Sequence, residues 1–224
     1  KKFFRPQLPD LHDPFLMKDM DKAVSRVQQA LDNGEGILVY GDYDVDGTTA
    51  VAMMYSFLKK FHPKVRTYIP DRNNEGYGVS RKGIDYAQNN KCSLIIALDC
   101  GIKADKEIDY AASKGIDIII CDHHRPSDKL PGAVAVLDPK RPDCRYPFKE
   151  LSGCGVGLKL IQAVCKSKGW DEKAVLAEYL DLAAVSIGAD IVPIVDENRI
   201  LAYYGLKKLN SNPCPGIKAF TIFS

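Results

Sequence analysis

The chain contains 224 residues, of which 46% are hydrophobic and 27% are charged, and its formal net charge is +2. This composition is typical of a globular protein with a substantial core, and no apolar run is long enough to predict a membrane span. The cysteines form no CxxC pair, which favours reduced core thiols over a zinc or disulfide site. We therefore expect a cytoplasmic protein with no membrane association.

The spacing of apolar residues predicts three regions along the chain. Residues 1–35 are expected to wrap over the surface and to end in a helix. Residues 36–150 alternate short Ile/Val/Leu runs with amphipathic segments, which is typical of a mainly parallel sheet flanked by helices. Residues 151–224 have a helical pattern and predict a helical extension of the same α/β domain. The predicted strands are 37–40, 65–69, 94–98, 116–121 and 133–137, and the predicted helices are 21–31, 48–61, 80–90, 104–114, 155–168, 172–187 and 198–209.

Acidic side chains follow four of the predicted strands. These residues are Asp42, Asp99, Asp122 and Asp138. His123 and His124 come directly after Asp122, and they are two of only four histidines in the chain. Because ligands of parallel α/β sheets bind beyond the carboxyl ends of the strands, we expect several of these side chains to share one site.

Three aspartates alternate within residues 41–47, namely Asp42, Asp44 and Asp46. Their mutual repulsion predicts a bound cation. A calcium EF-hand loop would need a glutamate where Met53 stands, and a phosphate-binding loop would need a lysine that this stretch lacks. A role in capping a helix accounts for one of the three aspartates and leaves two unexplained.

Several carboxylates together with imidazole suit Mn²⁺ or Mg²⁺ better than a structural zinc ion. The number of acidic groups predicts two ions. Two such ions about 3.5–4 Å apart can activate water and stabilise both the attacking and the leaving oxygen of a phosphoryl transfer. This edge of the sheet therefore predicts metal-assisted phosphoester hydrolysis.

Four motifs occur in a fixed order, and together they resemble those of the DHH phosphoesterases. They are Gly-Asp-Tyr-Asp-Val-Asp-Gly at 41–47, Asp-Cys-Gly at 99–101, Asp-His-His at 122–124 and Gly-Ala-Asp-Ile-Val-Pro at 188–193. Further matches at residues 13–16, 69–78 and 152–157 make the chain similar to the RecJ branch, the single-strand-specific 5′ to 3′ DNA exonucleases. The resemblance spans nearly the whole chain.

The resemblance implies metal ligands at Asp42, Asp44, Asp46, Asp99, His123 and Asp190. Asp99 would bridge the two ions, His124 would face the scissile phosphate, and Asp122 would orient the histidine pair. Asp46 is included as a ligand because Leu38 stands where smaller members of the family carry a histidine.

Substrate contacts are expected from Arg72, Tyr77 and Arg125, and from the backbone N–H groups of Gly153 and Gly155. The two glycines are equally well explained as part of a turn and a helix cap. The basic residues near position 140 are interpreted as a solvated loop or as part of a groove that follows the DNA backbone.

The expected function is therefore a two-metal phosphodiesterase that degrades single-stranded DNA from its 5′ end, without an organic cofactor and with DNA repair proteins as possible partners. One alternative is a small-substrate member of the same family, which cleaves short oligonucleotides, cyclic dinucleotides or pyrophosphate. Another is an inactive scaffold that binds single strands. The family usually carries a second, DHHA1-like domain, and no motif of that domain occurs before Ser224, so we expect the 224 residues alone to bind metal but to degrade DNA weakly.

Overall fold

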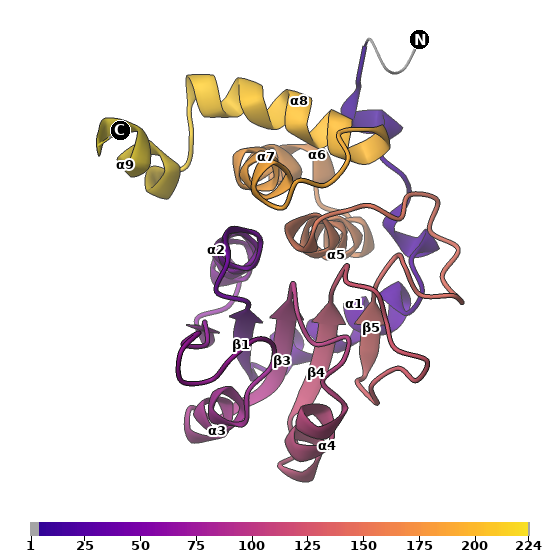
Figure 1. Ribbon diagram of the computed structural model, residues 1–224, viewed down its shortest axis with the longest axis vertical. Coiled ribbons are helices and arrows are strands. Elements are labelled where there is room, and N and C mark those ends of the chain that lie inside the picture. Colours follow the sequence, from indigo (N-terminus) through magenta and orange to yellow (C-terminus); the bar gives the residue numbers. More distant parts are fainter. Residues whose placement is uncertain (1–4, 224) are drawn as a thin grey trace.

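Short runs of Ile, Leu and Val form one sheet in the computed structural model, which describes residues 5–223 (Figure 1). Residues 1–4 of the predicted wrapping segment and residue 224 of the predicted helical extension lie outside the described residues. The strands are β1 Gly36–Gly41, β2 Val65–Tyr68, β3 Cys92–Leu98, β4 Asp117–Cys121 and β5 Ala135–Leu137. The helices are α1 Met20–Asp32, α2 Val45–Lys59, α3 Arg81–Asn89, α4 Asp105–Ser113, α5 Gly153–Lys168, α6 Glu172–Ala177, α7 Leu180–Ala189, α8 Asp196–Ser211 and α9 Pro215–Phe223, and the 3₁₀ turns are η1 Leu8–Asp10 and η2 Pro14–Leu16.

All strand pairs are parallel, and the strand order is β2-β1-β3-β4-β5. The chain moves outward from β1 to β2 and then returns past β1 to β3 and the remaining strands. The strand order therefore reverses between β1 and β3. In open α/β sheets, such a reversal creates a crevice at the carboxyl ends of the two central strands.

The two faces of the sheet are covered by different helices, as Figure 1 shows. Leu38 and Tyr40 pack on the face that also holds the buried residues of α3 and α4. Ile37 and Val39, which alternate with them, belong to the larger core formed with α1, α2 and α5. Burial on both faces explains why β1, β3, β4 and β5 are mostly apolar, whereas the edge strand β2 has the exposed residues Arg66 and Thr67, and the arrangement confirms the predicted fold class.

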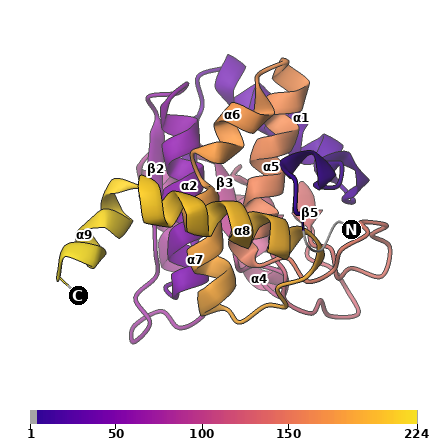
Figure 2. The same cartoon turned by 90° about the horizontal axis from the view of Figure 1, so that it is seen from above.

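Helix α5 is the central helix of the C-terminal region. Its residues 153–165 are all buried, because the sheet, α1, α2 and α7 surround it. Helix α7 packs on α2 and α5, and α8 crosses over α7 (Figure 2). None of the helices in the described part of the chain has the length and apolar character needed to cross a membrane.

Two helices differ from the prediction in ways that affect the site. Helix α2 begins at Val45 and not at residue 48, because the Asp44 side chain accepts a hydrogen bond from the Gly47 N–H and caps the helix at an earlier residue. The single helix predicted over 172–187 is two helices. Glu178 and Tyr179 donate to carbonyls three residues earlier, and this tighter turn separates α6 from α7 and buries Tyr179.

Candidate metal centre

The sheet register aligns four aspartates at one edge. The last paired residues of the four neighbouring strands lie side by side, and they are Gly41, Leu98, Cys121 and Leu137. The residue that follows each of them is an aspartate, in the order Asp42, Asp99, Asp122 and Asp138. Asp42 and Asp99 leave β1 and β3, so they border the crevice where the strand order reverses.

Asp99 lies at the middle of this edge in a strained conformation. Its φ of 59° is in the left-handed region, which is unfavourable for most residues other than glycine. The Asp99 N–H donates to the Cys121 carbonyl at 2.8 Å, and the Tyr77 hydroxyl donates to the Asp99 carbonyl at 3.4 Å. Contacts on both sides of the peptide thus hold a conformation of the kind often found at functional sites.

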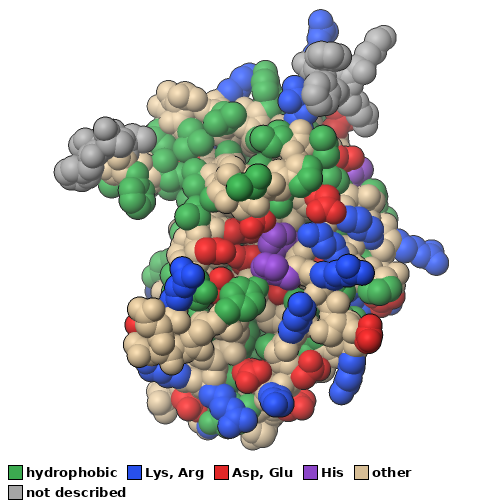
Figure 3. Space-filling view, viewed as in Figure 1, with side chains coloured by type: hydrophobic (Ala, Val, Ile, Leu, Met, Phe, Trp, Pro, Cys, Tyr) green, Lys and Arg blue, Asp and Glu red, His purple; other side chains and the backbone are tan. Residues whose placement is uncertain are grey.

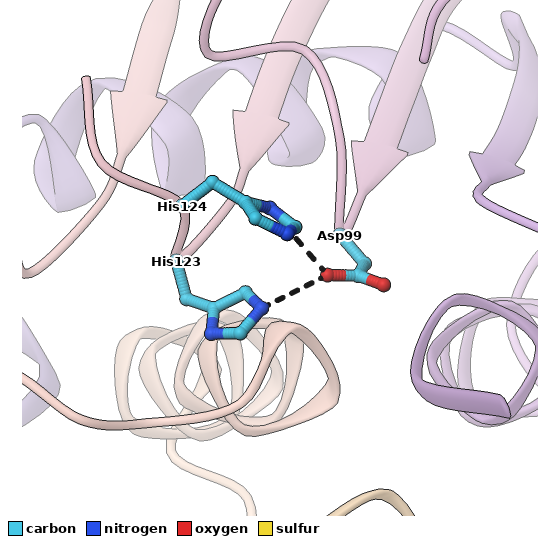
Figure 4. A group of neighbouring side chains, drawn as sticks. All are labelled: Asp99, His123 and His124. Atoms are coloured by element: carbon cyan, nitrogen blue, oxygen red, sulfur yellow. Dashed lines mark ion pairs between the residues drawn. The ribbon is translucent and has the colours of Figure 1, made fainter. Parts of the chain in front are cut away.

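The predicted ligands converge around His123. Its Nε2 atom lies 3.1 Å from Asp99 Oδ1, 3.6 Å from Asp190 Oδ2 and 3.7 Å from Asp46 Oδ2. Figure 4 shows the rings of His123 and His124 both directed toward Asp99. Ligand atoms of Asp99 lie within 4.8 Å of those of the two histidines and also within 4.8 Å of those of Asp42 and Asp44. Asp99 therefore lies between two groups of ligand atoms.

Buried polar atoms in this cluster lack hydrogen bonds. Within the described residues, Asp42 Oδ1, Asp99 Oδ1 and both ring nitrogens of His123 are buried and have no hydrogen-bond partner. Such atoms carry a large desolvation penalty when they are unpaired. A divalent cation would satisfy the two carboxylate oxygens and His123 Nε2, the ring nitrogen that faces the carboxylates, since these are ligands that Mn²⁺ accepts. The residues present therefore fit a metal centre.

The electrostatics of the cluster lead to the same conclusion. Burial and the neighbouring carboxylates of Asp46, Asp44 and Asp122 raise the pKa of Asp99 to about 10. Burial and the charge of Asp44 also raise the pKa of Asp42. The protein alone therefore disfavours the ionised carboxylates, and positive charge at the site would restore them.

Asp122 and His124 form a hydrogen-bonded pair behind the cluster. Asp122 is fully buried, and its Oδ1 accepts from His124 Nδ1 at 2.7 Å and from the His123 N–H at 2.7 Å. Burial alone would raise the pKa of Asp122, but the hydrogen bonds and charge of His124 and the hydrogen bond from the Ile102 N–H hold that pKa below its usual range. The bond to Asp122 in turn raises the pKa of His124.

Asp46 differs from the other carboxylates because the protein already satisfies it. Its Oδ2 accepts from the Gly153 N–H at 2.7 Å, and its Oδ1 accepts from the Cys154 N–H at 2.8 Å and from the Ser186 hydroxyl at 2.7 Å. Asp46 thus connects the first turn of α2 to the first turn of α5 and to α7. It also lies beside His123, so it combines this connecting role with a position at the rim of the cluster.

The prediction that the N–H groups of Gly153 and Gly155 bind substrate phosphates needs correction. The Gly153 N–H donates to Asp46, and the Gly155 N–H donates to the Ser152 hydroxyl that caps α5. Close packing against Asp99 explains why position 153 is a glycine. A Cβ atom there would lie 2.5 Å from the Cβ of Asp99.

The other three predicted substrate contacts lie around the cluster and are exposed. The guanidinium of Arg72 stacks over the ring of Tyr43, 5.3 Å from its centroid. The Tyr77 hydroxyl lies 3.2 Å from His124 Nδ1. Arg125 directly follows the histidines and points outward. In Figure 3, acidic side chains flank the two neighbouring histidines, basic side chains lie beside and below them, and hydrophobic side chains lie above them.

Sequence reasoning missed Ser152 and Ser186, which form part of the support for the cluster. The Ser186 hydroxyl donates to Asp46 and also lies 2.6 Å from the Ser152 hydroxyl. Ser186 precedes Asp190, the C-cap residue of α7, by four residues, and this spacing places both on one face at the end of the helix. Asp138 was noticed as a strand exit but was not assigned to the site. It is fully buried beside the cluster, and burial raises its pKa to about 7.

Residues 36–187 match the family model described as "DHH family, N-terminal domain". The chain is 43% identical over 216 residues to the single-stranded-DNA-specific exonuclease RecJ of Bacillus subtilis (strain 168). That alignment covers 96% of this chain but 27% of the Bacillus protein, so the chain spans about a quarter of that relative.

Solved structures of similar proteins share the fold. An exonuclease RecJ bound to manganese aligns with a TM-score of 0.79 and 32% identity, covering 91% of this chain and 50% of that one. RecJ of Thermus thermophilus in complex with Mn²⁺ aligns with a TM-score of 0.81 and 28% identity, covering 97% of this chain and 30% of that one. The same protein in complex with Mg²⁺ gives a TM-score of 0.67 and 26% identity, covering 98% of this chain and 27% of that one. The range matched by the family model, 36–187, contains the first three of the four motifs. Because this range covers more than half of the chain, the chain belongs to the DHH family.

Proposed function

We propose that this chain is the catalytic part of a metal-dependent phosphodiesterase that degrades single-stranded DNA from its 5′ end. Similarity to relatives named as single-stranded-DNA-specific exonucleases supports the substrate, and structures of such relatives with Mn²⁺ or Mg²⁺ support the cofactor. The chain spans only part of those relatives. The activity and the substrate of the whole protein are therefore proposed from this similarity.

The observation that carries the proposal is the convergence, from separate strand exits, of buried ligand atoms that make no hydrogen bond within the described residues. Asp42, Asp99 and His123 each present at least one buried atom that makes no hydrogen bond within the described residues. A purely structural cluster would satisfy these atoms with neighbouring donors and acceptors. Buried ligand atoms without hydrogen bonds are expected where a bound cation completes the site.

We assign the ligands by their grouping around Asp99. Asp42 and Asp44 would hold one ion, His123 and Asp190 the other, and Asp99 would contact both, with Asp46 at the rim of the second group. When bound, the two ions supply positive charge that activates water and stabilises the oxygen that leaves the phosphate.

The chain's own groups then act on the scissile phosphate. His124 holds a proton on Nδ1 against Asp122, which orients the ring. When Nε2 is also protonated, as the raised pKa of His124 favours, it can donate to a phosphate oxygen. Arg72 and Arg125 are exposed cations that would hold neighbouring phosphates. Tyr77 would limit the movement of His124 through the contact with its ring.

The metal centre can be tested with Asp99→Asn, since asparagine tolerates the left-handed backbone at this position. Isothermal titration of the wild type with Mn²⁺ should detect binding, and the variant should lose affinity by at least about tenfold. Asp85→Asn is a matched control, because Asp85 is on α3 and its carboxylate pairs with Tyr110 and Lys114. Absence of Mn²⁺ binding by the wild type would favour the inactive scaffold.

The substrate can be tested by comparing a 5′-labelled long single strand, the same sequence as a duplex, and a dinucleotide. We expect the single strand to be degraded fastest, with release of the labelled end first. Cleavage of the dinucleotide alone would instead identify a small-substrate enzyme and would refute the exonuclease assignment. Asp99→Asn should remove the activity toward whichever substrate is cleaved.

We also propose the predicted division of the chain, with residues 36–150 as the sheet-bearing core and residues 151–224 as the helical part of the same domain. It is supported by the larger hydrophobic core, which includes Ile37, Val39 and Met53 from the first part and Val156 and Leu160 from the second. A cytoplasmic location and an association with DNA repair proteins stay predictions.

A further inference from the structure

The loop between α7 and α8 exposes several apolar side chains directly after the candidate ligand Asp190. These side chains are Ile191, Pro193, Ile194 and Val195, which we term the apolar ledge. Ile191 is 87% exposed, Ile194 54% and Val195 47%. Single exposed apolar residues are common on protein surfaces, but a contiguous group beside a functional site usually marks a binding surface.

The backbone conformation of the loop holds the side chains of the ledge toward solvent. Ile191 has a φ of 56°, which is a genuine outlier for a β-branched residue. Val192 is buried between the exposed residues, and the buried Asn198 side chain donates to the Pro193 carbonyl at 3.1 Å. The loop therefore maintains an unfavourable conformation that directs an isoleucine into solvent. Strain of this kind tends to persist where it serves a function.

The surroundings of the candidate metal centre are asymmetric. On the Asp190 side, next to His123, lies the apolar ledge. On the His124 side lie the exposed Arg125 and a cavity of about 420 Å³, whose lining combines Arg81 and Lys103 with Glu75, Glu107 and Asp122. In Figure 3, hydrophobic side chains lie over α7 and α8 above the histidines, and basic side chains lie beside and below the histidines.

An unpaired nucleic-acid strand has a matching asymmetry, because its phosphates lie on one side and the faces of its bases on the other. Duplex DNA hides those faces in its base stack. From this complementarity we infer that the apolar ledge contacts the unstacked bases of a single strand whose phosphates pass the metal centre on its basic side. The ledge would then favour unpaired strands over duplex DNA. The inference deepens the proposed function and rests on it.

The test separates contacts to bases from contacts to phosphates. Binding of the protein to a fluorescent, 5′-phosphorylated oligothymidine of about 12 nucleotides is compared with binding to an abasic strand of the same length. Ca²⁺ replaces Mn²⁺ in this experiment so that the strand is bound while cleavage is slow. Wild type should bind oligothymidine more tightly than the abasic strand.

Ile191→Ser should weaken binding to oligothymidine by about fivefold and should change binding to the abasic strand by less than about twofold. Ile191→Asn, which suits the left-handed backbone, and Ile194→Ser should act in the same direction. The matched control is Leu206→Ser on α8, because Leu206 is 55% exposed and lies outside the ledge. This control should bind both strands like wild type.

Each other outcome is informative. Equal weakening toward both strands, or no change toward either, overturns the inference and leaves the ledge as a surface for protein contacts. Equal affinity of the wild type for the two strands also overturns it, while the proposed function stands. Failure of the wild type to bind any strand refutes the proposed function itself, and the inference with it.

Discussion

Asp46 is a carboxylate whose hydrogen bonds are complete before any ion is bound. Two backbone N–H groups at the start of α5 and the Ser186 hydroxyl donate to it. An acidic side chain at a helix N-terminus also interacts favourably with the helix dipole. By contrast, Asp44 is exposed, and its side chain accepts a hydrogen bond from the Gly47 N–H that caps α2. Neighbouring aspartates of one motif therefore have different structural roles.

This difference predicts opposite results for two conservative substitutions. In Asp46→Asn, an N–H₂ group replaces one carboxylate oxygen and faces the N–H or O–H donor that this oxygen accepted from. Because two donors then face each other, the substitution should lower the free energy of unfolding by about 2–3 kcal/mol. Asp44→Asn should change that free energy by less than about 0.5 kcal/mol, because asparagine is an equally good N-cap. Urea denaturation in EDTA checks both without a contribution from metal binding. Equal stability of Asp46→Asn and wild type would show that the connection to α5 adds nothing to stability.

At the scale of elements, the start of α5 and the end of β3 are packed against each other without intervening side chains. Gly153 is the first residue of α5, and it lies directly on Asp99. The Ser152 hydroxyl caps the helix through the Gly155 N–H. The position of α5 therefore helps to determine where the Asp99 carboxylate lies in the metal centre.

Gly153→Ala tests this contact. The added Cβ would lie 2.6 Å from Asp99 Oδ1, so the carboxylate must move. We expect the affinity for Mn²⁺, measured by isothermal titration, to fall at least about tenfold. The free energy of unfolding should fall by about 1–3 kcal/mol, as in other overpacked sites.

Gly188→Ala is the matched control on α7, where a Cβ would meet no atom within 4 Å. It should leave Mn²⁺ affinity unchanged and should stabilise the helix by about 0.5–1 kcal/mol. Wild-type Mn²⁺ affinity in Gly153→Ala would show that α5 does not position Asp99.

At the scale of the whole molecule, buried ionic contacts join the N-terminal segment to distant parts of the chain. The Lys159 ammonium on α5 lies 2.9 Å from the buried carboxylate of Glu197 on α8, which also accepts from the His12 N–H. Asp19 Oδ2 lies 2.6 Å from the buried guanidinium of Arg141, just beyond β5. These contacts hold the segment before β1 against the sheet and the last helices.

The pair of Asp19 and Arg141 predicts a pH-dependent contribution to stability. Burial alone would raise the pKa of Asp19, but hydrogen bonds from Arg141 and Lys22 lower it below its ordinary value of 3.8. A carboxyl group whose pKa is lower in the folded state than in the unfolded state stabilises the fold at pH values above its unfolded-state pKa. This contribution is lost as the pH falls through the folded-state pKa. Asp19→Asn should therefore be less stable than wild type by about 1–3 kcal/mol at pH 7, and the difference should shrink below about pH 4.

Asparagine is the informative replacement, since Asp19 has a φ of 64° that asparagine tolerates. Asp32→Asn provides the control, because the ion pair that Asp32 forms with Lys168 in the described part of the chain is exposed. Its effect should stay below about 0.5 kcal/mol at either pH. A stability difference for Asp19→Asn that does not change between pH 7 and pH 3 would contradict the pairing.

Much of the fold was predictable because its signals are local. The unbroken apolar strands could only be buried on both faces, which indicated a parallel α/β sheet. That class of sheet also places the residues after its strands at one edge, so Asp42, Asp99 and Asp122 could be expected to meet. The motif order identified the family before any distance was known.

Other features depend on contacts between residues far apart in the chain, which no local pattern contains. Examples are the hydrogen bonds from α5 and α7 to Asp46, the contact of Gly153 with Asp99, and the division of α6 from α7 at Tyr179. Thus the sequence by itself determined the fold class, the family and the set of candidate ligands, because each follows from residue type and short spacing. Only the tertiary structure decided which carboxylates are already paired, which remain unpaired and which apolar side chains face the site, because burial and hydrogen bonding depend on how the helices pack on the sheet.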